Sequence, residues 1–435
     1  MGKKLRKKKR KNRNKKLRQH KEINAISKQI DREDNCLHQG PTGADGRQGR
    51  NIDLEEKKDD LISRLEDDIL CHILSLVPLR CAVQTSLLSN RWRNLWRKAI
   101  EFQGTIEDFP RVITSVLESS DRRMLFHFGQ GSILATIKDR EEVNLSFSDG
   151  GPGTFSLFDW NLELNPQTPS SQLFSCIKNI HLKSVNKLTS QIVSSVISKL
   201  QLLESLQISE CKGLQSLNIE AGSRFQTLTI LDCLQLNEIY VLAYNLRKLV
   251  FQGQLPWFCL KCSPNLETVI LDFRHGPGYN PFACENLLCL LMDIKHVKAL
   301  TVSAWLFKVP ISKWLPSAGA IWVRNDFVFN NLKELCWIDS SMGNQSSIAT
   351  LTSFLRICPF LEQLVINVDP RNYCSPSWGG CSFWKDYSNR VASATTLEHL
   401  NVVKFKGVLG HEDEILLAEC LAEVASEELK LMHVE

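Results

Sequence analysis

Two cysteines with the spacing of a zinc or redox pair, Cys259 and Cys262, are the strongest candidates for chemistry in the sequence. A structural zinc site needs four ligands, and the next cysteines, Cys284 and Cys289, follow at a spacing that does not repeat the pair. The residues around Cys259 are apolar, so the pair fits the core of a packed structure better than a metal or redox site.

Other catalytic patterns are incomplete or missing from the sequence. His411 and Glu412 could begin a zinc-protease motif, but no second histidine lies four residues after the first. The sequence contains neither a phosphate-binding loop nor a nucleophile elbow. No motif therefore predicts a catalytic residue, a metal site or a cofactor, although spacing alone leaves a catalytic cysteine open because nothing distinguishes any of the fifteen.

The fifteen cysteines are odd in number and scattered through apolar segments. This usage suits a reducing compartment, where buried thiols behave as small hydrophobic side chains. The first twenty residues are basic where a secretory signal would be apolar, and no apolar run approaches the roughly 18 residues that span a bilayer. We expect a protein inside the cell that is not embedded in a membrane.

The positive charge is concentrated in residues 1–21, which contain 13 Lys and Arg residues and no acid. Without these charges the net charge of +5 becomes −8, so the body of the chain is mildly acidic. Residues 1–55 lack hydrophobic periodicity, and we expect a disordered basic tail. The tail fits a nuclear import signal, a nucleic-acid arm or a solubilising segment; with no aromatic platform for bases, nucleic-acid binding is the weaker expectation.

Residues 61–100 have the pattern of three short helices. Leu65, Ile69, Ile73 and Leu76 are spaced for one face of a first helix, and Ser63 with Glu66 predicts a capping box at its start. Shorter helices are expected at about 80–87 and 89–98, the latter capped by Ser89. So small a unit cannot bury all its apolar surface alone, which predicts a partner for the remaining face.

From Ile177 onward, the pattern apolar-x-x-apolar-x-apolar recurs. The triplets that start at residues 203, 214, 225, 236 and 246 advance by ten or eleven residues, so two triplets make a coil of 21 or 22. This is a solenoid period, in which each coil buries its apolar face against its neighbours. Later triplets are spaced by 29 to 36 residues, which we interpret as repeats with insertions or as degenerate repeats.

Helical stretches precede some of the expected strands. Apolar residues of 188–200 and of 348–358 follow helical spacing just before the triplets at Leu203 and Leu361. A strand on the inside and a helix or loop on the outside predict an α/β leucine-rich-repeat horseshoe.

Residues 60–96 closely resemble a plant F-box. The resemblance rests on Asp60-Leu61-Ile62-Ser63, Asp67-Asp68-Ile69-Leu70, Ile73-Leu74-Ser75 and the block Leu88-Ser89-Asn90-Arg91-Trp92-Arg93-Asn94-Leu95-Trp96. The segment from Val402 to Ala418 is similar to the FBD region that ends many plant F-box, leucine-rich-repeat proteins. This family resemblance covers most of residues 60–435.

The resemblance implies a non-catalytic subunit that recruits substrates to a Skp, cullin, F-box ubiquitin ligase and acts by proximity. The F-box would bind the Skp adaptor, and through it a cullin and a RING subunit, while the repeats would capture an unknown target protein for ubiquitination and degradation. Carried over by position, the adaptor-binding residues would be Leu65, Ile69, Leu70, Ile73, Leu74, Pro78, Ala82, Val83, Leu88, Trp92 and Trp96. Trp92 and Trp96 fit the core of the helical unit equally well.

One position departs from the family pattern, because Glu66 stands where the F-box usually has Pro. We expect weakened rather than abolished adaptor binding, since Glu is well tolerated in a first helical turn. The alternative is a repeat scaffold that no longer directs degradation, with a tail that could bind nucleic acid.

The expected organisation is a basic tail at 1–55, an F-box at 58–100, a linker at 101–142, leucine-rich repeats at 143–375 and a strand-strand-helix FBD-like segment at 376–435. The residues that bind the substrate are unknown, although tryptophans beside the repeat strands are frequent hot spots; these are Trp305, Trp314, Trp322, Trp378 and Trp384. The tail alone points to the nucleus, so we expect a nuclear or cytoplasmic protein, or both.

Overall fold

A computed structural model describes most of the chain after residue 61. The described residues are 62–100 apart from 63, 64 and 78, then 109–118, 123–128, 131–139, 141–148, 176–277 apart from 262, 284–308, 327–340, 345–373, 397–407, and 411–434 apart from 423, 424 and 426–428. The basic tail at 1–55 lies outside these residues. The chain divides into two compact units, Met1–Phe102 and Gln103–Glu435.

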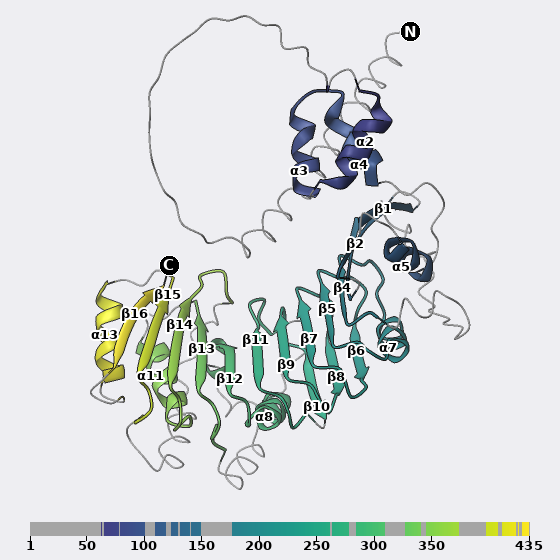
Figure 1. The fold of residues 1–435 in the computed structure, drawn as a ribbon. Helices are drawn as coiled ribbons and strands as arrows, with labels where there is room; N and C mark the ends of the chain where they lie inside the picture. Colours follow the sequence, from purple (N-terminus) through teal and green to yellow (C-terminus); the bar gives the residue numbers. More distant parts are fainter. Residues whose placement is uncertain are drawn as a thin grey trace, which may run out of the picture. The chain divides into compact units, whose positions relative to one another are not determined.

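The first unit is a small bundle of short helices (Figure 1). Its elements are α2 (Asp67–Leu76), α3 (Leu79–Gln84), the 3-10 turns η2 (Thr85–Leu87) and η3 (Trp92–Asn94), and α4 (Leu95–Ile100). Helices α2 and α4 pack together around buried Leu70, Leu74, Leu95 and Trp96. The three predicted helical segments are therefore present, although the third begins as a 3-10 turn.

The starts of these helices differ from the predicted ones. Helix α2 begins at Asp67 with Glu66 as its N-cap, and no side chain caps it. Ser63, the other residue of the expected capping box, lies outside the described residues. The third segment begins after Arg91 rather than after Ser89. Asp67 and Asp68 in the first turn of α2 favour the positive end of the helix dipole instead.

The second unit is built on one long sheet of thirteen strands (Figure 1). Helix α5 (Phe109–Glu118) comes first, and β1 (Arg123–Phe128), β2 (Gly131–Lys138) and β3 (Glu142–Ser148) form an antiparallel start. From β3 onward every neighbouring pair in this sheet is parallel, as a solenoid requires. The described residues of 101–142, a range expected to be a linker, thus include helix α5, strands β1 and β2, and the first residue of β3.

The predicted period of two triplets per coil is confirmed by the central strands. Strands β5 (Ser205–Ser209), β7 (Thr227–Leu231), β9 (Lys248–Gln252) and β11 (Thr268–Asp272) pair side by side in the long sheet, after β4 (Asn179–Lys183). The alternate triplets form a second parallel sheet of β6 (Ser216–Glu220), β8 (Glu238–Leu242) and β10 (Trp257–Lys261). In both sheets the apolar triplet positions alternate inward and are buried, which forms the core between them.

Helices lie at the two sides of this second sheet (Figure 1). Helix α7 (Ser190–Lys199) contacts β6, where Ser194 Oγ donates to the Asn218 carbonyl at 2.8 Å and Ser190 Oγ accepts from the Asn218 amide at 2.8 Å. Helix α8 (Cys284–Asp293) contacts β10. Each edge strand of the small sheet is therefore covered by a helix, which removes an exposed strand edge.

The later repeats are longer and carry helices between their strands. They comprise β12 (Ala299–Ser303), α9 (Trp305–Lys308), β13 (Glu334–Asp339), α11 (Gln345–Leu355), β14 (Gln363–Val368), β15 (Val402–Lys406), α13 (His411–Ala422) and β16 (Lys430–Val434). All of these strands continue the long sheet in parallel, so they are repeats with insertions. The described end of the chain runs strand, helix, strand, where strand-strand-helix was expected.

Asparagine and charged side chains connect successive coils. Asn265 Nδ2 donates to the Tyr244 carbonyl at 3.1 Å and to Asn245 Oδ1 at 3.2 Å, and Asn245 Nδ2 donates to the Ser223 carbonyl. This explains why an asparagine precedes the first leucine of several triplets: the leucine enters the core while the asparagine forms hydrogen bonds to the preceding coil. Lys298 Nζ and Glu267 lie 2.9 Å apart at the same end of the strands and add an exposed ion pair between coils.

Candidate functional site

Apolar side chains remain exposed on the small helical unit. Ile69 and Ile73 lie one turn apart on α2 with exposed fractions of 47% and 40%, while their neighbours Leu70 and Leu74 are buried. Leu87 and Leu88, in the turn after α3, are 86% and 69% exposed. We call these four exposed residues the apolar face of the helical unit. Such an apolar surface is typical of a protein interface.

The predicted adaptor-binding residues divide into two groups by burial. Leu70, Leu74, Ala82 and Trp96 are no more than 2% exposed, so their side chains form the core and are unavailable for direct contact. Ile69, Ile73 and Leu88 are exposed, and Leu65 and Trp92 are half-buried. Pro78 and the Val83 side chain lie outside the described residues. The family pattern therefore mixes residues that stabilise the unit with residues that can face a partner.

Glu66 has a backbone conformation that proline would also adopt. Its φ of −66° and ψ of 154° lie in the extended region, close to the φ that a proline ring imposes. The adjacent turn is held by Arg91, whose Nε donates to Asp67 Oδ1 at 2.9 Å and whose Nη2 donates to the Leu65 carbonyl. The start of α2 thus has a backbone conformation that a proline at position 66 could adopt.

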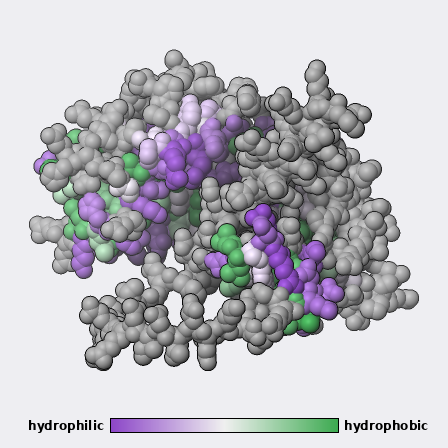
Figure 2. Space-filling view, turned by 90° about the horizontal axis from the view of Figure 1, so that it is seen from above, coloured by the Kyte–Doolittle hydropathy of each residue, from purple (hydrophilic) through white to green (hydrophobic). Residues whose placement is uncertain are grey.

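The outward face of the long sheet carries an uncharged row at its centre. Strand register places one side chain from each of six successive strands in this row, and all six are half-buried; they are Thr229, Val250, Ile270, Thr301, Cys336 and Val365. At about 4.8 Å per strand the row is about 24 Å long. On the face shown in Figure 2, hydrophilic and hydrophobic residues lie next to one another.

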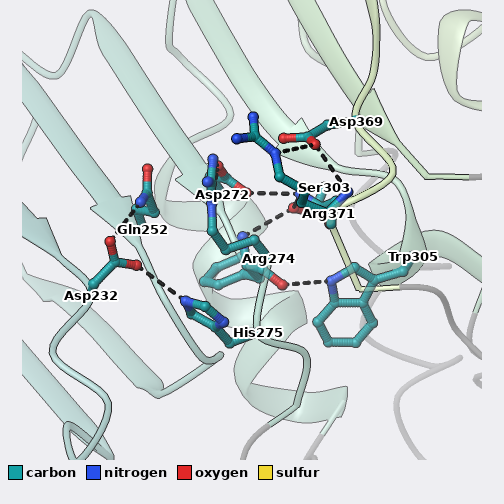
Figure 3. A network of polar contacts seen from close by, with 11 residues as sticks. Asp232, Gln252, Asp272, Arg274, His275, Ser303, Trp305, Asp369 and Arg371 are labelled. Atoms are coloured by element: carbon teal, nitrogen blue, oxygen red, sulfur yellow. Dashed lines mark hydrogen bonds and ion pairs between the residues drawn. The ribbon is translucent and has the colours of Figure 1, made fainter. Parts of the chain in front are cut away.

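A polar network lies at the carboxyl ends of the same parallel strands (Figure 3). Asp272, the last residue of β11, is 5% exposed, and its Oδ2 accepts from Arg274 Nε at 2.9 Å and also from Arg274 Nη2. Its other oxygen accepts from Asn372 Nδ2 at 2.8 Å, across 100 residues of sequence. The turn after β14 therefore crosses the ends of β13 and β12 to reach β11.

Further contacts fix this turn. Asp369 Oδ1 accepts from the Arg371 amide at 3.0 Å and from Arg371 Nε at 3.1 Å. Tyr373, two residues after Arg371, packs edge-on against Trp305, with ring centres 5.2 Å apart. Gly276 has a φ of +76°, and a Cβ there would lie 2.6 Å from the Tyr373 ring, so a glycine is needed at this close approach.

The charges of the network shift the pKa values of its members. The pKa of Asp369 is lowered, because hydrogen bonds from Arg371 and the charges of Arg371 and Arg274 outweigh its burial. Partial burial lowers the pKa of Arg274, but Asp272, Asp369 and Asp232 together raise it above its ordinary value. Asp232 also accepts from Gln252 Nε2 at 2.8 Å and lies 3.1 Å from His275 Nε2. Arg274 and Arg371 therefore both act on the charge of Asp369.

Several sequence candidates for chemistry or binding have other positions in the structure. Cys259 is a half-buried residue of β10, and Cys262 lies outside the described residues. Within the described ranges no group of three His, Cys, Asp or Glu side chains could hold a metal ion. Trp305 is 3% exposed and donates to the Phe273 carbonyl at 2.9 Å, while the other four tryptophans proposed for binding lie outside the described residues.

None of the helices that the structure describes is long and apolar enough to span a membrane.

Comparisons with known proteins agree with this architecture. Residues 161–408, more than half of the chain, match the family model described as At1g61320/AtMIF1, LRR domain, and residues 62–102 match the F-box domain model. The putative FBD-associated F-box protein At1g61330 of Arabidopsis thaliana is 22% identical over 416 residues, which is 84% of this chain and 89% of the relative.

Two other Arabidopsis thaliana relatives align over a shorter part. The putative F-box/LRR-repeat protein At3g18150 is 27% identical over 208 residues, 42% of this chain and 45% of the relative. F-box/LRR-repeat protein 25 is 27% identical over 203 residues, 41% of this chain and 78% of the relative. The chain thus aligns with less than half the length of At3g18150.

Proposed function

Because the chain belongs to the family of the At1g61320/AtMIF1 LRR domain and also carries an F-box domain, we propose that it is a substrate-recognition subunit of a Skp, cullin, F-box ubiquitin ligase. An adaptor role of this general kind agrees with relatives named F-box/LRR-repeat and FBD-associated F-box proteins. In this role the F-box binds the Skp adaptor, which connects it to a cullin and a RING subunit.

The observation that carries the proposal is the apolar face of the helical unit. Ile69, Ile73 and Leu88 are exposed although the unit has a buried core of its own around Leu70 and Trp96. Exposed apolar residues beside a packed core are costly in water unless a partner covers them. We assign adaptor contact to these exposed residues, together with half-buried Leu65 and Trp92.

The repeats are the part of the chain that we propose binds a target protein for ubiquitination. The protein itself acts as a non-catalytic adaptor, because holding a target near a ubiquitin-charged enzyme raises its effective concentration without a reactive group on the adaptor. The uncharged row of the long sheet supplies a continuous surface for such a target.

Binding to a purified plant Skp adaptor tests this function. The full chain and the adaptor are co-expressed, and the complex is isolated for the native chain, Ile73→Asp, Leu88→Asp and the control Leu234→Asp. Leu234 is 53% exposed in the repeat unit, so its variant makes the same change away from the F-box. We expect the native chain and the control to retain the adaptor and both F-box variants to lose it. Failure of the native chain to bind would leave a repeat scaffold without a ligase role.

We also propose that the protein acts in the nucleus, the cytoplasm or both. The support is the basic run in residues 1–21. A fluorescent reporter fused to residues 1–21 is expected to enter the nucleus, and a reporter that stays cytoplasmic would remove the nuclear assignment.

A further inference from the structure

The side chains of Arg274 and Arg371 form the outer layer of the polar network. The carboxylates that hold them are largely buried, with side-chain exposures of 7% for Asp272 and 11% for Asp369, whereas the Arg371 side chain is 83% exposed. Arg274 is more enclosed, at 26%. Figure 3 shows the two arginines, which come from turns after different strands, beside the same pair of aspartates. A ligand from solvent therefore meets guanidinium groups before it meets carboxylates.

These guanidinium groups keep donors available after their internal bonds are made. Arg371 bonds Asp369 through Nε, and among the described residues no acceptor is hydrogen-bonded to its two Nη groups. Arg274 bonds Asp272 through Nε and Nη2, and its Nη1 has no acceptor within the described ranges. A planar guanidinium that is fixed at one edge presents its remaining N–H groups in a defined direction, which suits a carboxylate.

A purely structural role does not account for Arg371. The turn after β14 is already connected to β11 by the buried hydrogen bond between Asn372 and Asp272. Asp369 is also held by the Arg371 backbone amide, a bond that any residue except proline would provide. The exposed ion pair between the Arg371 side chain and Asp369 adds little stability in water. Its guanidinium is thus positioned at the surface without being needed for the fold.

We propose that Arg274 and Arg371 form a binding site for an acidic segment of the target protein, one that carries aspartate or glutamate side chains. This inference deepens the proposed function and rests on it. The site lies at the strand ends of the uncharged row, with Asp272 two residues beyond Ile270 on β11. The carboxylates of a bound segment contact the two arginines, and its uncharged residues lie along the row.

The neighbouring acids weaken the attraction of this site for any anion. Asp232, Asp272 and Asp369 all act on Arg274 and offset part of its positive charge. Binding therefore depends on hydrogen bonds to the free guanidinium N–H groups, whose paired geometry suits a carboxylate. Aspartate and glutamate side chains are the expected ligands.

Selection from a display library tests the site, with random twelve-residue peptides as the probe. Phage that display these peptides are selected on the full native chain, on Arg371→Gln, on the double variant Arg274→Gln with Arg371→Gln, and on Arg247→Gln. Arg247 lies at the opposite ends of the same strands, directly before β9, so its variant controls for the loss of one charge. Thermal unfolding and adaptor binding are measured for every variant.

We expect peptides enriched in Asp and Glu on the native chain and on Arg247→Gln, and no such enrichment on the double variant. A selected acidic peptide, labelled for fluorescence anisotropy, is expected to bind Arg371→Gln about tenfold more weakly than the native chain. Selected peptides without acidic enrichment, or equal binding to Arg371→Gln and Arg247→Gln, would overturn the site. Tighter binding of a phosphoserine version would overturn the carboxylate assignment.

The two proposals fail separately in these measurements. A chain that binds the Skp adaptor but selects no acidic peptides retains the proposed function and loses this site. A chain that selects acidic peptides through Arg371 but does not bind the adaptor retains the site and loses the ligase role.

Discussion

Replacement of Asn372 by alanine tests the connection between the turn after β14 and the end of β11. Asn372 is 4% exposed, and its Nδ2 donates to Asp272 Oδ1 at 2.8 Å and to Ser303 Oγ at 3.4 Å. The variant removes a hydrogen bond to a buried carboxylate, and such bonds contribute about 1.5–3 kcal/mol. We therefore expect the free energy of unfolding of the repeat unit to fall by about 2–3 kcal/mol.

Urea denaturation followed by far-UV circular dichroism measures this change, with Asn367→Ala as the matched control. Asn367 is a half-buried residue of β14, and its side chain makes no hydrogen bond with any residue that the structure describes. Its replacement is expected to change stability by less than about 0.5 kcal/mol. Equal effects of the two substitutions would show that the bond to Asp272 does not hold the turn, and the reasoning would be refuted.

Three further substitutions have defined outcomes. Leu70→Ala removes a fully buried side chain and should cost the helical unit about 2–5 kcal/mol in urea unfolding, against less than about 1 kcal/mol for Ile73→Ala; equal losses would contradict the division into core and surface. Glu66→Pro should stabilise the same unit by up to about 1 kcal/mol, because the φ of −66° already suits proline, and a lower midpoint would disprove this. His181 has its pKa lowered to about 4, mainly by burial and then by Lys183, so as pH falls from about 7.5 to about 5 the unfolded chain binds a proton that the folded chain does not. The native chain should then lose about 2 kcal/mol more stability than His181→Gln over that range, and parallel pH profiles would exclude this assignment.

The repeats are the most predictable part of the fold, because the same apolar triplet recurs in the sequence of each coil. The triplet that starts at Leu203 gives β5, and the triplet that starts at Leu214 gives β6, each strand beginning two residues later. The helix before Leu361 was also recognisable from its periodicity. These features depend on residues close in sequence, which a spacing argument can use.

The antiparallel start of the sheet was missed although a signal was present. Ile133, Ala135 and Ile137 are buried and alternate with more exposed residues along β2, the two-residue period of a strand. From the sequence, residues 101–142 are instead expected to be a linker. This two-residue period is the sequence signal that predicts β2.

Two other features could not be read from spacing. The network around Asp272 joins residues 100 positions apart, and only the stacking of the coils brings Asn372 to β11. The division of the F-box residues into core and surface was equally hidden, since Leu70 and Ile69 are adjacent, apolar and part of one motif. Their burial depends on how α2 packs against α4.

The affinity of the full chain for a plant Skp adaptor, measured by titration calorimetry, tests the central claim most directly. The native chain should bind, and Ile73→Asp, which changes an exposed residue that the core does not need, should bind at least about tenfold more weakly while its unfolding midpoint stays the same. Equal affinity of the two chains, or no binding by either, would contradict the assignment of this apolar face to the adaptor.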